Sequence, residues 1–189
     1  DVYLTKDGEV IVHHDDQVIH PDGRHIKITE ETLDTLKRVD VGQGEKMPTL
    51  KEVFEQCGSL FKIINVEIKS TTNFTDGIEE KVINLIKEFK LENKIIISSF
   101  NPLCLLRVKR LAPQIPRGYL VEPTVWYQRF LFWPKLCKAH TINLDHHWLA
   151  ENPKLLDKYK KLKKDIWVWT VNSEQAMKKW INLGAQAII

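Results

Sequence analysis

Apolar positions in this chain fall mostly in short continuous runs, which alternate with longer segments of helical periodicity. Runs rich in β-branched residues predict six strands, at 62–69, 94–100, 118–122, 140–144, 165–171 and 185–189. Helical spacing, together with capping residues and prolines, predicts helices at 76–89, 102–111, 153–164 and 174–183. Because the strands are apolar almost throughout and helices connect them, we expect a parallel sheet with both faces covered.

The first 61 residues have a different pattern. Asp7-Gly8 separates two alternating runs within residues 2–13, which predicts a β-hairpin. Residues 20–60 are polar and predict loops with surface helices, one of which begins at a capping box formed by Thr49 and Glu52.

Two architectures fit this alternation of strands and helices: a doubly wound open sheet and a closed (β/α)8 barrel. The sequence contains neither a G-x-G-x-x-G motif nor a P-loop, so a nucleotide-binding fold has no motif to support it. A barrel needs eight strands, and residues 1–4 resemble the tail of one further strand. The chain begins at Asp1 without Met and ends on an apolar run, so we expect both ends to be truncated, with the first strand and part of the second lying upstream.

Composition narrows the functional classes. The chain has 189 residues, of which 43% are hydrophobic and 28% charged, as in an ordinary globular domain. No apolar run approaches the roughly 20 residues that cross a bilayer, and a net charge of +3 is too small to indicate nucleic-acid binding. The three cysteines are far apart without a C-x-x-C spacing, which is typical of reduced thiols and favours a reducing compartment such as the cytoplasm.

Two groups of polar residues are candidates for chemistry. Asn65, Glu67 and Lys69 are spaced by two in an apolar strand, so their side chains share one face. Charges are costly to bury there, which leaves a structural Glu67–Lys69 ion pair or a functional site as alternatives. His14 lies in a His-His-Asp-Asp cluster after the predicted hairpin, where either a general acid/base or a surface turn fits.

An ordered set of motifs points to a known family. The chain carries, in order, Asp1-Val-Tyr-Leu-Thr-Lys-Asp-Gly, His14-Asp15, Pro48-Thr-Leu, Asn65-Val-Glu67-Ile-Lys69, Ser98-Ser-Phe100, Trp169-Thr-Val-Asn172 and Gly184. With this set it resembles the glycerophosphodiester phosphodiesterase family over essentially its whole length. The resemblance implies an α/β fold of the (β/α)8 TIM-barrel type, with one partial barrel domain over residues 1–189 and a small insertion at 16–61.

The resemblance also implies catalytic roles. Asp1 matches the aspartate of a Glu-x-Asp metal pair, Glu67 a further metal carboxylate, His14 the second of two catalytic histidines, and Lys69 a phosphate-binding residue. Hard carboxylate ligands suit one divalent cation, Mg²⁺ or Ca²⁺. The other histidine, in a His-Arg-Gly segment, and the metal-binding Glu are expected before Asp1, so we expect the 189 residues alone to be inactive.

The implied substrate pocket would be lined by Phe100, Trp169 and Glu122. The expected reaction is metal-dependent hydrolysis of glycerophosphodiesters to sn-glycerol 3-phosphate and an alcohol. Lysophospholipids are an alternative substrate class, and a non-catalytic phosphodiester-binding barrel is a further alternative. Residues 125–133 are unusually aromatic and could either pack on the barrel or form a lid or a peripheral membrane contact. The oligomeric state is not defined by the sequence.

Overall fold

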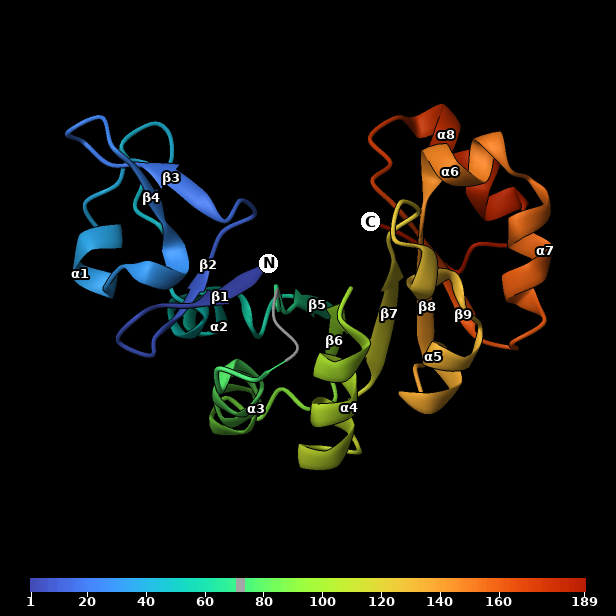
Figure 1. Cartoon of the computed structure of the whole chain (residues 1–189), viewed down its shortest axis with the longest axis horizontal. Helices are drawn as coiled ribbons and strands as arrows, with labels where there is room; N and C mark the ends of the chain where they lie inside the picture. Colours follow the sequence, from blue (N-terminus) through green and yellow to red (C-terminus); the bar gives the residue numbers. More distant parts are fainter. Residues whose placement is uncertain (71–73) are drawn as a thin grey trace.

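The core of the fold is one six-stranded parallel sheet. The computed structural model describes residues 1–70 and 74–189. The strands follow one another in the order β10-β9-β8-β7-β6-β5, so each lies beside its neighbour in sequence (Figure 1). Their bounds are β5 Ile64–Glu67, β6 Ile95–Ser99, β7 Arg117–Val121, β8 Thr141–Asp145, β9 Asp165–Trp169 and β10 Ala187–Ile188. All six predicted strands are present, and their pairing is parallel as expected.

The N-terminal hairpin extends this row of strands. β1 (Val2–Leu4) pairs antiparallel with β2 (Val10–Val12), which confirms the predicted hairpin around Asp7-Gly8. β1 also continues the sheet, because Val2 forms a parallel bridge with Ile68 just beyond β5. The sheet curls, and the two chain ends face each other across the opening that the curl leaves (Figure 1). A curled sheet with this uninterrupted strand order is that of a partial (β/α)8 barrel and not of a doubly wound sheet.

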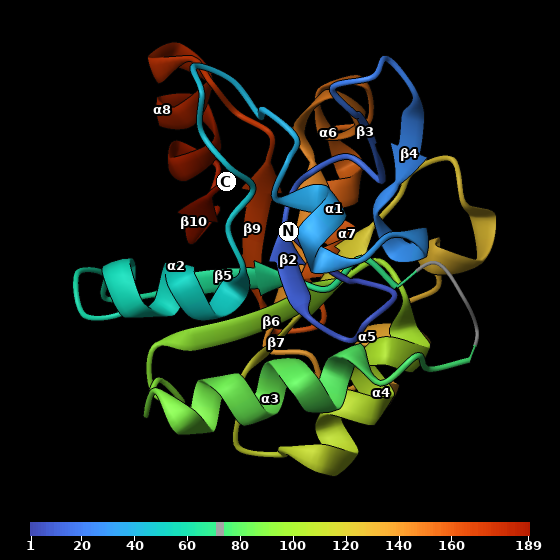
Figure 2. The same cartoon turned by 90° about the vertical axis from the view of Figure 1, so that its left-hand side faces the viewer.

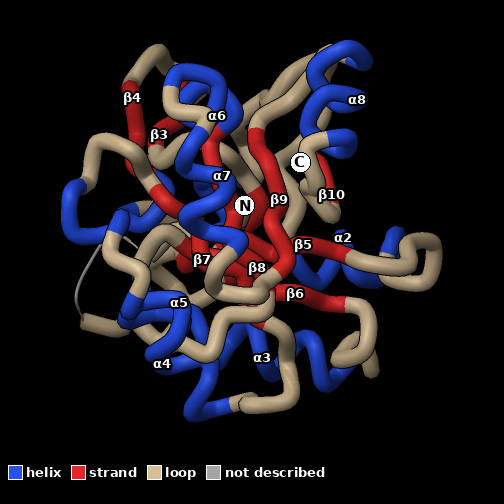
Figure 3. The backbone as a smooth tube through the Cα atoms, turned by 90° about the vertical axis from the view of Figure 1, so that its right-hand side faces the viewer, coloured by secondary structure: helices blue, strands red, loops and turns tan. Residues whose placement is uncertain are grey.

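Helices cover the outside of the curl. Figure 2 shows α3 and α4 side by side next to β6, and Figure 3 shows α7 beside β9 and α8 beside β10, while α6 contacts β8. The helices are α3 Ile78–Glu88, α4 Pro102–Leu111, α5 Phe132–Leu136, α6 His146–Glu151, α7 Lys154–Lys160 and α8 Glu174–Asn182. The side chain of Ser173 caps α8, as its position in the sequence predicts, and the side chain of Asn101 caps α4. No helix of the described residues is long and apolar enough to cross a membrane.

The helix predicted at 153–164 is shorter than expected, since it ends at Lys160, and an unpredicted helix precedes it. Residues 146–160 form two helices, and Asn152 ends the first one instead of capping the second. α6 begins immediately after β8 because the Asp145 side chain accepts a hydrogen bond of 2.6 Å from the amide of Trp148. Pro153 then stands at the start of α7.

Residues 16–61 follow the hairpin and contain several short elements. They contain α2 (Leu50–Cys57), which begins at the predicted capping box, and also α1 (Leu33–Leu36) and a short 3₁₀ helix at Ile28–Glu30. A hairpin of β3 (Gln17–Ile19) and β4 (His25–Lys27) was not expected there. Buried apolar side chains from this region pack on Tyr3 and Ile11. The division into one domain over residues 1–189 with an insertion at 16–61 remains a prediction.

The interior of the curled sheet is partly polar. Ser98 of β6 and Thr141 and Asn143 of β8 are buried, and Gly118 of β7 lies between them. The apolar core lies mainly between the sheet and its helices, in one cluster around α3 and α4 and another around α7 and α8.

Candidate active site

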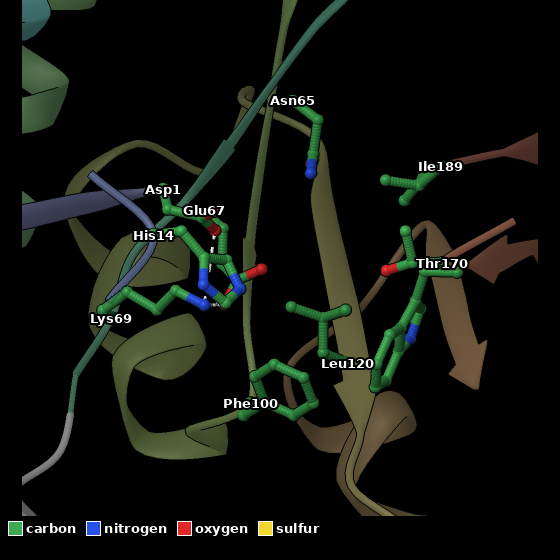
Figure 4. Close-up of a pocket in the computed structure, with 10 residues that line it drawn as sticks. Asp1, His14, Asn65, Glu67, Lys69, Phe100, Leu120, Thr170 and Ile189 are labelled. Carbon is green, nitrogen blue, oxygen red and sulfur yellow. Dashed lines mark ion pairs between the residues drawn. The ribbon is translucent and has the colours of Figure 1, made fainter. Parts of the chain in front are cut away.

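A cavity of about 320 Å³ opens on the inner side of the sheet (Figure 4). This volume is at the lower end of the ~300–1,000 Å³ typical of small-molecule sites. Ten residues line it: Asp1, His14, Asn65, Glu67, Lys69, Phe100, Leu120, Trp169, Thr170 and Ile189. Most of them stand at or just after the carboxyl ends of strands, which is where barrel enzymes place their chemistry.

Charged groups form one side of the cavity. The Lys69 ammonium lies 2.8 Å from Glu67 Oε1 and 3.4 Å from Asp1 Oδ1, so both carboxylates meet at a single cation (Figure 4). The three side chains are between 14% and 25% exposed. At this partial burial, opposite charges interact more strongly than they do in water. The structure therefore contains the Glu67–Lys69 ion pair and also places it in a cavity.

Hydrogen bonds from the neighbouring strands hold the backbone under Lys69. The Lys69 amide donates to the carbonyl of Val2 at 3.1 Å, and the Ser99 hydroxyl donates to the carbonyl of Ile68 at 2.8 Å. β1 and β6 thus fix the segment from both sides. As a result, Asp1, which is 68 residues away in the sequence, reaches the Lys69 head group.

Two buried oxygens in the cavity have free lone pairs. Asn65 Oδ1 has no hydrogen-bond partner, and Glu67 Oε1 lies within ion-pair distance of Lys69 without the directionality of a hydrogen bond. Buried polar atoms are usually satisfied, so such a pair on one strand face suits a ligand that supplies positive charge. Within residues 1–70 and 74–189 no group of three or more His, Cys, Asp or Glu is close enough to hold a metal. The donor set is therefore two carboxylates and one amide oxygen, which is hard-cation chemistry.

His14 lies at the rim of the cavity. Its side chain is 76% exposed, and its Nδ1 lies 2.7 Å from Asp15 Oδ1. This hydrogen bond lowers the pKa of the Asp15 carboxyl. The Tyr3 hydroxyl donates to the carbonyl of His14 at 3.1 Å and fixes the backbone. With Nδ1 directed at a carboxylate, Nε2 is the ring nitrogen left for proton transfer.

An apolar wall faces the charged side. Phe100 and Trp169 meet edge to face with ring centroids 5.5 Å apart, and Leu120 and Ile189 complete the wall. A cavity with one charged and one apolar side suits a small molecule that has both a charged and an apolar part.

The structure brings six of the seven predicted site residues to this cavity, and Glu122 is the exception. The Glu122 carboxylate accepts hydrogen bonds from the amide and the hydroxyl of Thr124, so it stabilises the turn after β7. Sequence reasoning did not select Leu120, Thr170 and Ile189 as lining residues. In the sequence, an apolar strand residue that lines a cavity looks the same as one that packs in the core. The two-residue spacing does, however, place Gly118 and Leu120 on the same face of β7.

Comparison with known proteins identifies the family. The sequence profile of the Glycerophosphoryl diester phosphodiesterase family matches residues 1–189. The chain belongs to this family. The predicted family and the predicted barrel are both confirmed. The family comprises phosphoric diester hydrolases, and its members generally depend on a divalent cation.

Individual relatives agree with this assignment. A curated glycerophosphodiester phosphodiesterase from Caldanaerobacter subterraneus subsp. tengcongensis is 35% identical over all of this chain and 79% of its own length. A crystal structure of a putative family member from Galdieria sulphuraria has a TM-score of 0.84 at 23% identity, covering all of this chain and 78% of that one, and shows the same fold. An Oleispira antarctica phosphodiesterase in complex with sn-glycerol-3-phosphate has a TM-score of 0.78 at 27% identity, with the same coverages.

Proposed function

We propose that this member of the family hydrolyses glycerophosphodiesters to sn-glycerol 3-phosphate and an alcohol. The observation that carries the proposal is the grouping of His14, two carboxylates and Lys69 in one cavity at the carboxyl ends of the strands. The product named in the Oleispira antarctica complex is the product expected here.

His14 is proposed to carry one proton transfer of the reaction. An oxygen nucleophile, either water or a substrate hydroxyl, forms a new bond to phosphorus, and the bond from phosphorus to the leaving alkoxide breaks. Nε2 of His14 can take the proton of the attacking hydroxyl or give one to the leaving oxygen. Asp15 orients the ring through its contact with Nδ1. Such a role is worth about 10²–10⁴ in rate.

Lys69 is proposed to bind the phosphate, because its ammonium is a fixed positive charge inside the cavity. Asp1 and Glu67 would hold a divalent cation, with the free lone pair of Glu67 Oε1 as the clearest donor. When bound, the cation would neutralise a non-bridging phosphate oxygen. The residues suit Mg²⁺ or Ca²⁺, both of which take oxygen ligands.

The test is release of sn-glycerol 3-phosphate from glycerophosphocholine by the protein expressed from its complete coding sequence. We expect His14→Ala to lower kcat at least about a hundredfold. The adjacent His13→Ala is the matched control, since His13 does not line the cavity, and we expect it to stay within a few-fold of the parent. Near-normal turnover of His14→Ala, or substrate binding without turnover in the parent, would refute the proposal.

Lysophospholipids are a second candidate substrate class, and the apolar wall favours them. Phe100, Leu120, Trp169 and Ile189 give the cavity a side that an acyl chain could contact. Comparing kcat/KM for lysophosphatidylcholine and glycerophosphocholine separates the two classes. A Trp169→Ala variant should lose more activity on the lysophospholipid if the chain lies on this wall, and equal losses would argue for the deacylated substrate.

A further inference from the structure

The segment after β7 has an exposed aromatic surface that the proposed reaction does not use. Trp126, Tyr127, Phe130 and Phe132, called the aromatic patch here, are 64%, 42%, 47% and 50% exposed. Their rings mostly contact one another, with Trp126 edge to face against Phe130 at 5.5 Å and against Tyr127 at 6.1 Å. Isolated apolar residues on a surface are ordinary, but a contiguous group of large rings marks an interaction site.

The aromatic patch is held in place by a buried residue. The carbonyl of Gln128 accepts a hydrogen bond of 2.9 Å from the Tyr119 hydroxyl, and its side-chain Oε1 accepts one of 2.9 Å from the Glu122 amide. Gln128 is only 6% exposed, so the 3₁₀ turn Trp126–Arg129 is anchored on β7 while its rings point outward. Little conformational entropy therefore remains to be lost when the rings meet a partner.

The segment that carries the aromatic patch has only basic charged residues. Between Glu122 and Asp145 the chain has no acidic residue but includes Arg129, Lys135 and Lys138. A shallow groove of about 370 Å³ brings Arg129 and Lys158 beside Trp126, Phe130 and Trp148. Neither Arg129 nor Lys158 forms an ion pair with another residue in the described part of the chain. The surface thus combines exposed rings with unneutralised cations.

We propose that the aromatic patch, together with Arg129 and Lys158, docks the protein on the surface of a bilayer that contains anionic lipids. Tryptophan and tyrosine favour the membrane–water interface, since they have an apolar body and a polar tip. Cations beside them complement anionic headgroups, each worth about 1 kcal/mol, or roughly fivefold in binding. A second copy of this chain would bring the same cations against one another, which disfavours self-association. The segment follows the carboxyl end of β7, where Leu120 lines the cavity, so docking would turn that end of the strand towards the lipid.

The test measures binding to large unilamellar vesicles by co-sedimentation. The parent protein should bind vesicles of equal parts phosphatidylcholine and phosphatidylglycerol, and should bind pure phosphatidylcholine vesicles more weakly. Trp126→Ala with Phe130→Ala should weaken binding roughly a hundredfold, because each of the two buried rings is worth about a factor of ten. Arg129→Gln should weaken binding to the anionic vesicles about fivefold, and added salt should reduce that difference.

The matched control is Phe61→Ala. Phe61 is 53% exposed but precedes the amino end of β5, whereas the aromatic patch follows the carboxyl end of β7. This variant should bind like the parent. Equal losses for Phe61→Ala and the double variant, no binding by the parent, or a dimer in light scattering that the double variant abolishes would each overturn the proposal. Hydrolysis of soluble glycerophosphocholine should be unchanged in the double variant, so failure of docking and failure of the proposed activity are separately visible.

Discussion

Gly118 offers the sharpest test of the packing that supports the active site. It lies in β7, buried inside the curl, with Ser98 and Thr141 as its partners on the neighbouring strands. A Cβ added at Gly118 would lie 2.8 Å from Thr141 Oγ1, 3.1 Å from Asn143 Nδ2 and 3.2 Å from Ser98 Cβ. All three neighbours belong to buried strand residues that cannot swing away. Leu120, two residues on along the same face, lines the cavity.

The expected cost of Gly118→Ala follows from these contacts. Overpacking a tight interior costs about 1–3 kcal/mol in the free energy of unfolding, and three contacts shorter than ordinary van der Waals distance place this variant towards the upper end. For a chain of this size each kcal/mol lowers Tm by roughly 2–4 °C. Because the strain is transmitted to Leu120, we also expect KM for glycerophosphocholine to rise.

The assay is urea unfolding of a double-mutant cycle. Thr141→Ala removes the closest oxygen but also the 2.8 Å hydrogen bond from Thr141 to Asn143, which costs about 1 kcal/mol alone. The double variant should lose less free energy of unfolding than the two single variants lose together, and the difference should be about 0.5–3 kcal/mol. Ser98→Ala is the control, because it keeps Cβ and removes a buried hydroxyl that has no hydrogen-bond partner. It should be neutral or stabilising. A Gly118→Ala protein as stable as the parent, or strict additivity, would refute the packing argument.

Three further predictions concern the metal, the thiols and a helix cap. Chelation should abolish activity in the parent, and Glu67→Gln should remove the response to added Mg²⁺ or Ca²⁺; turnover that ignores chelator would count against a cation at this site. Burial raises the pKa of the Cys137 thiol to about 11 and that of Cys104 well above its usual value. Only about one Cys137 in a thousand is then a thiolate at pH 8, and reactivity should grow as pH rises towards 11. Native protein at pH 8 should therefore react with a thiol reagent at Cys57 alone, as mass spectrometry can check; fast labelling of Cys137 would contradict its burial. Thr49→Ala removes the cap of α2 and should cost about 1 kcal/mol in chemical unfolding, while Thr49→Ser should cost much less.

Local signals determined most of the secondary structure. The helix at 102–111 has the predicted bounds, since Asn101 caps it, Pro102 suits its first turn and Pro113 follows its end. The helix predicted at 153–164 corresponds to α7, which ends earlier, at Lys160, and α6 before it was not predicted, because Asp145 initiates it directly after β8. The hairpin of β3 and β4 was missed because its strands have only three residues each, too short for a pattern to be visible.

The local pattern of residues was enough to select one strand as the candidate for the chemistry. The alternation of Asn65, Glu67 and Lys69 places three polar side chains on one strand face, and an apolar parallel strand tolerates such residues only where they are paired or functional. The family resemblance then assigned them to a phosphodiesterase site.

The residues that contact these side chains, and those that face them across the cavity, follow from the tertiary structure. Asp1 reaches Lys69 because β1 lies beside β5, and curling of the sheet brings Ile189 and Trp169 to the opposite wall of the cavity. Glu122 has the same chemistry as Glu67, yet it caps a turn. The physical reason is that periodicity fixes the face on which a residue lies, whereas the closing of the sheet fixes which faces enclose a cavity. Strand order and curvature arise from contacts between distant segments, and no local pattern contains them.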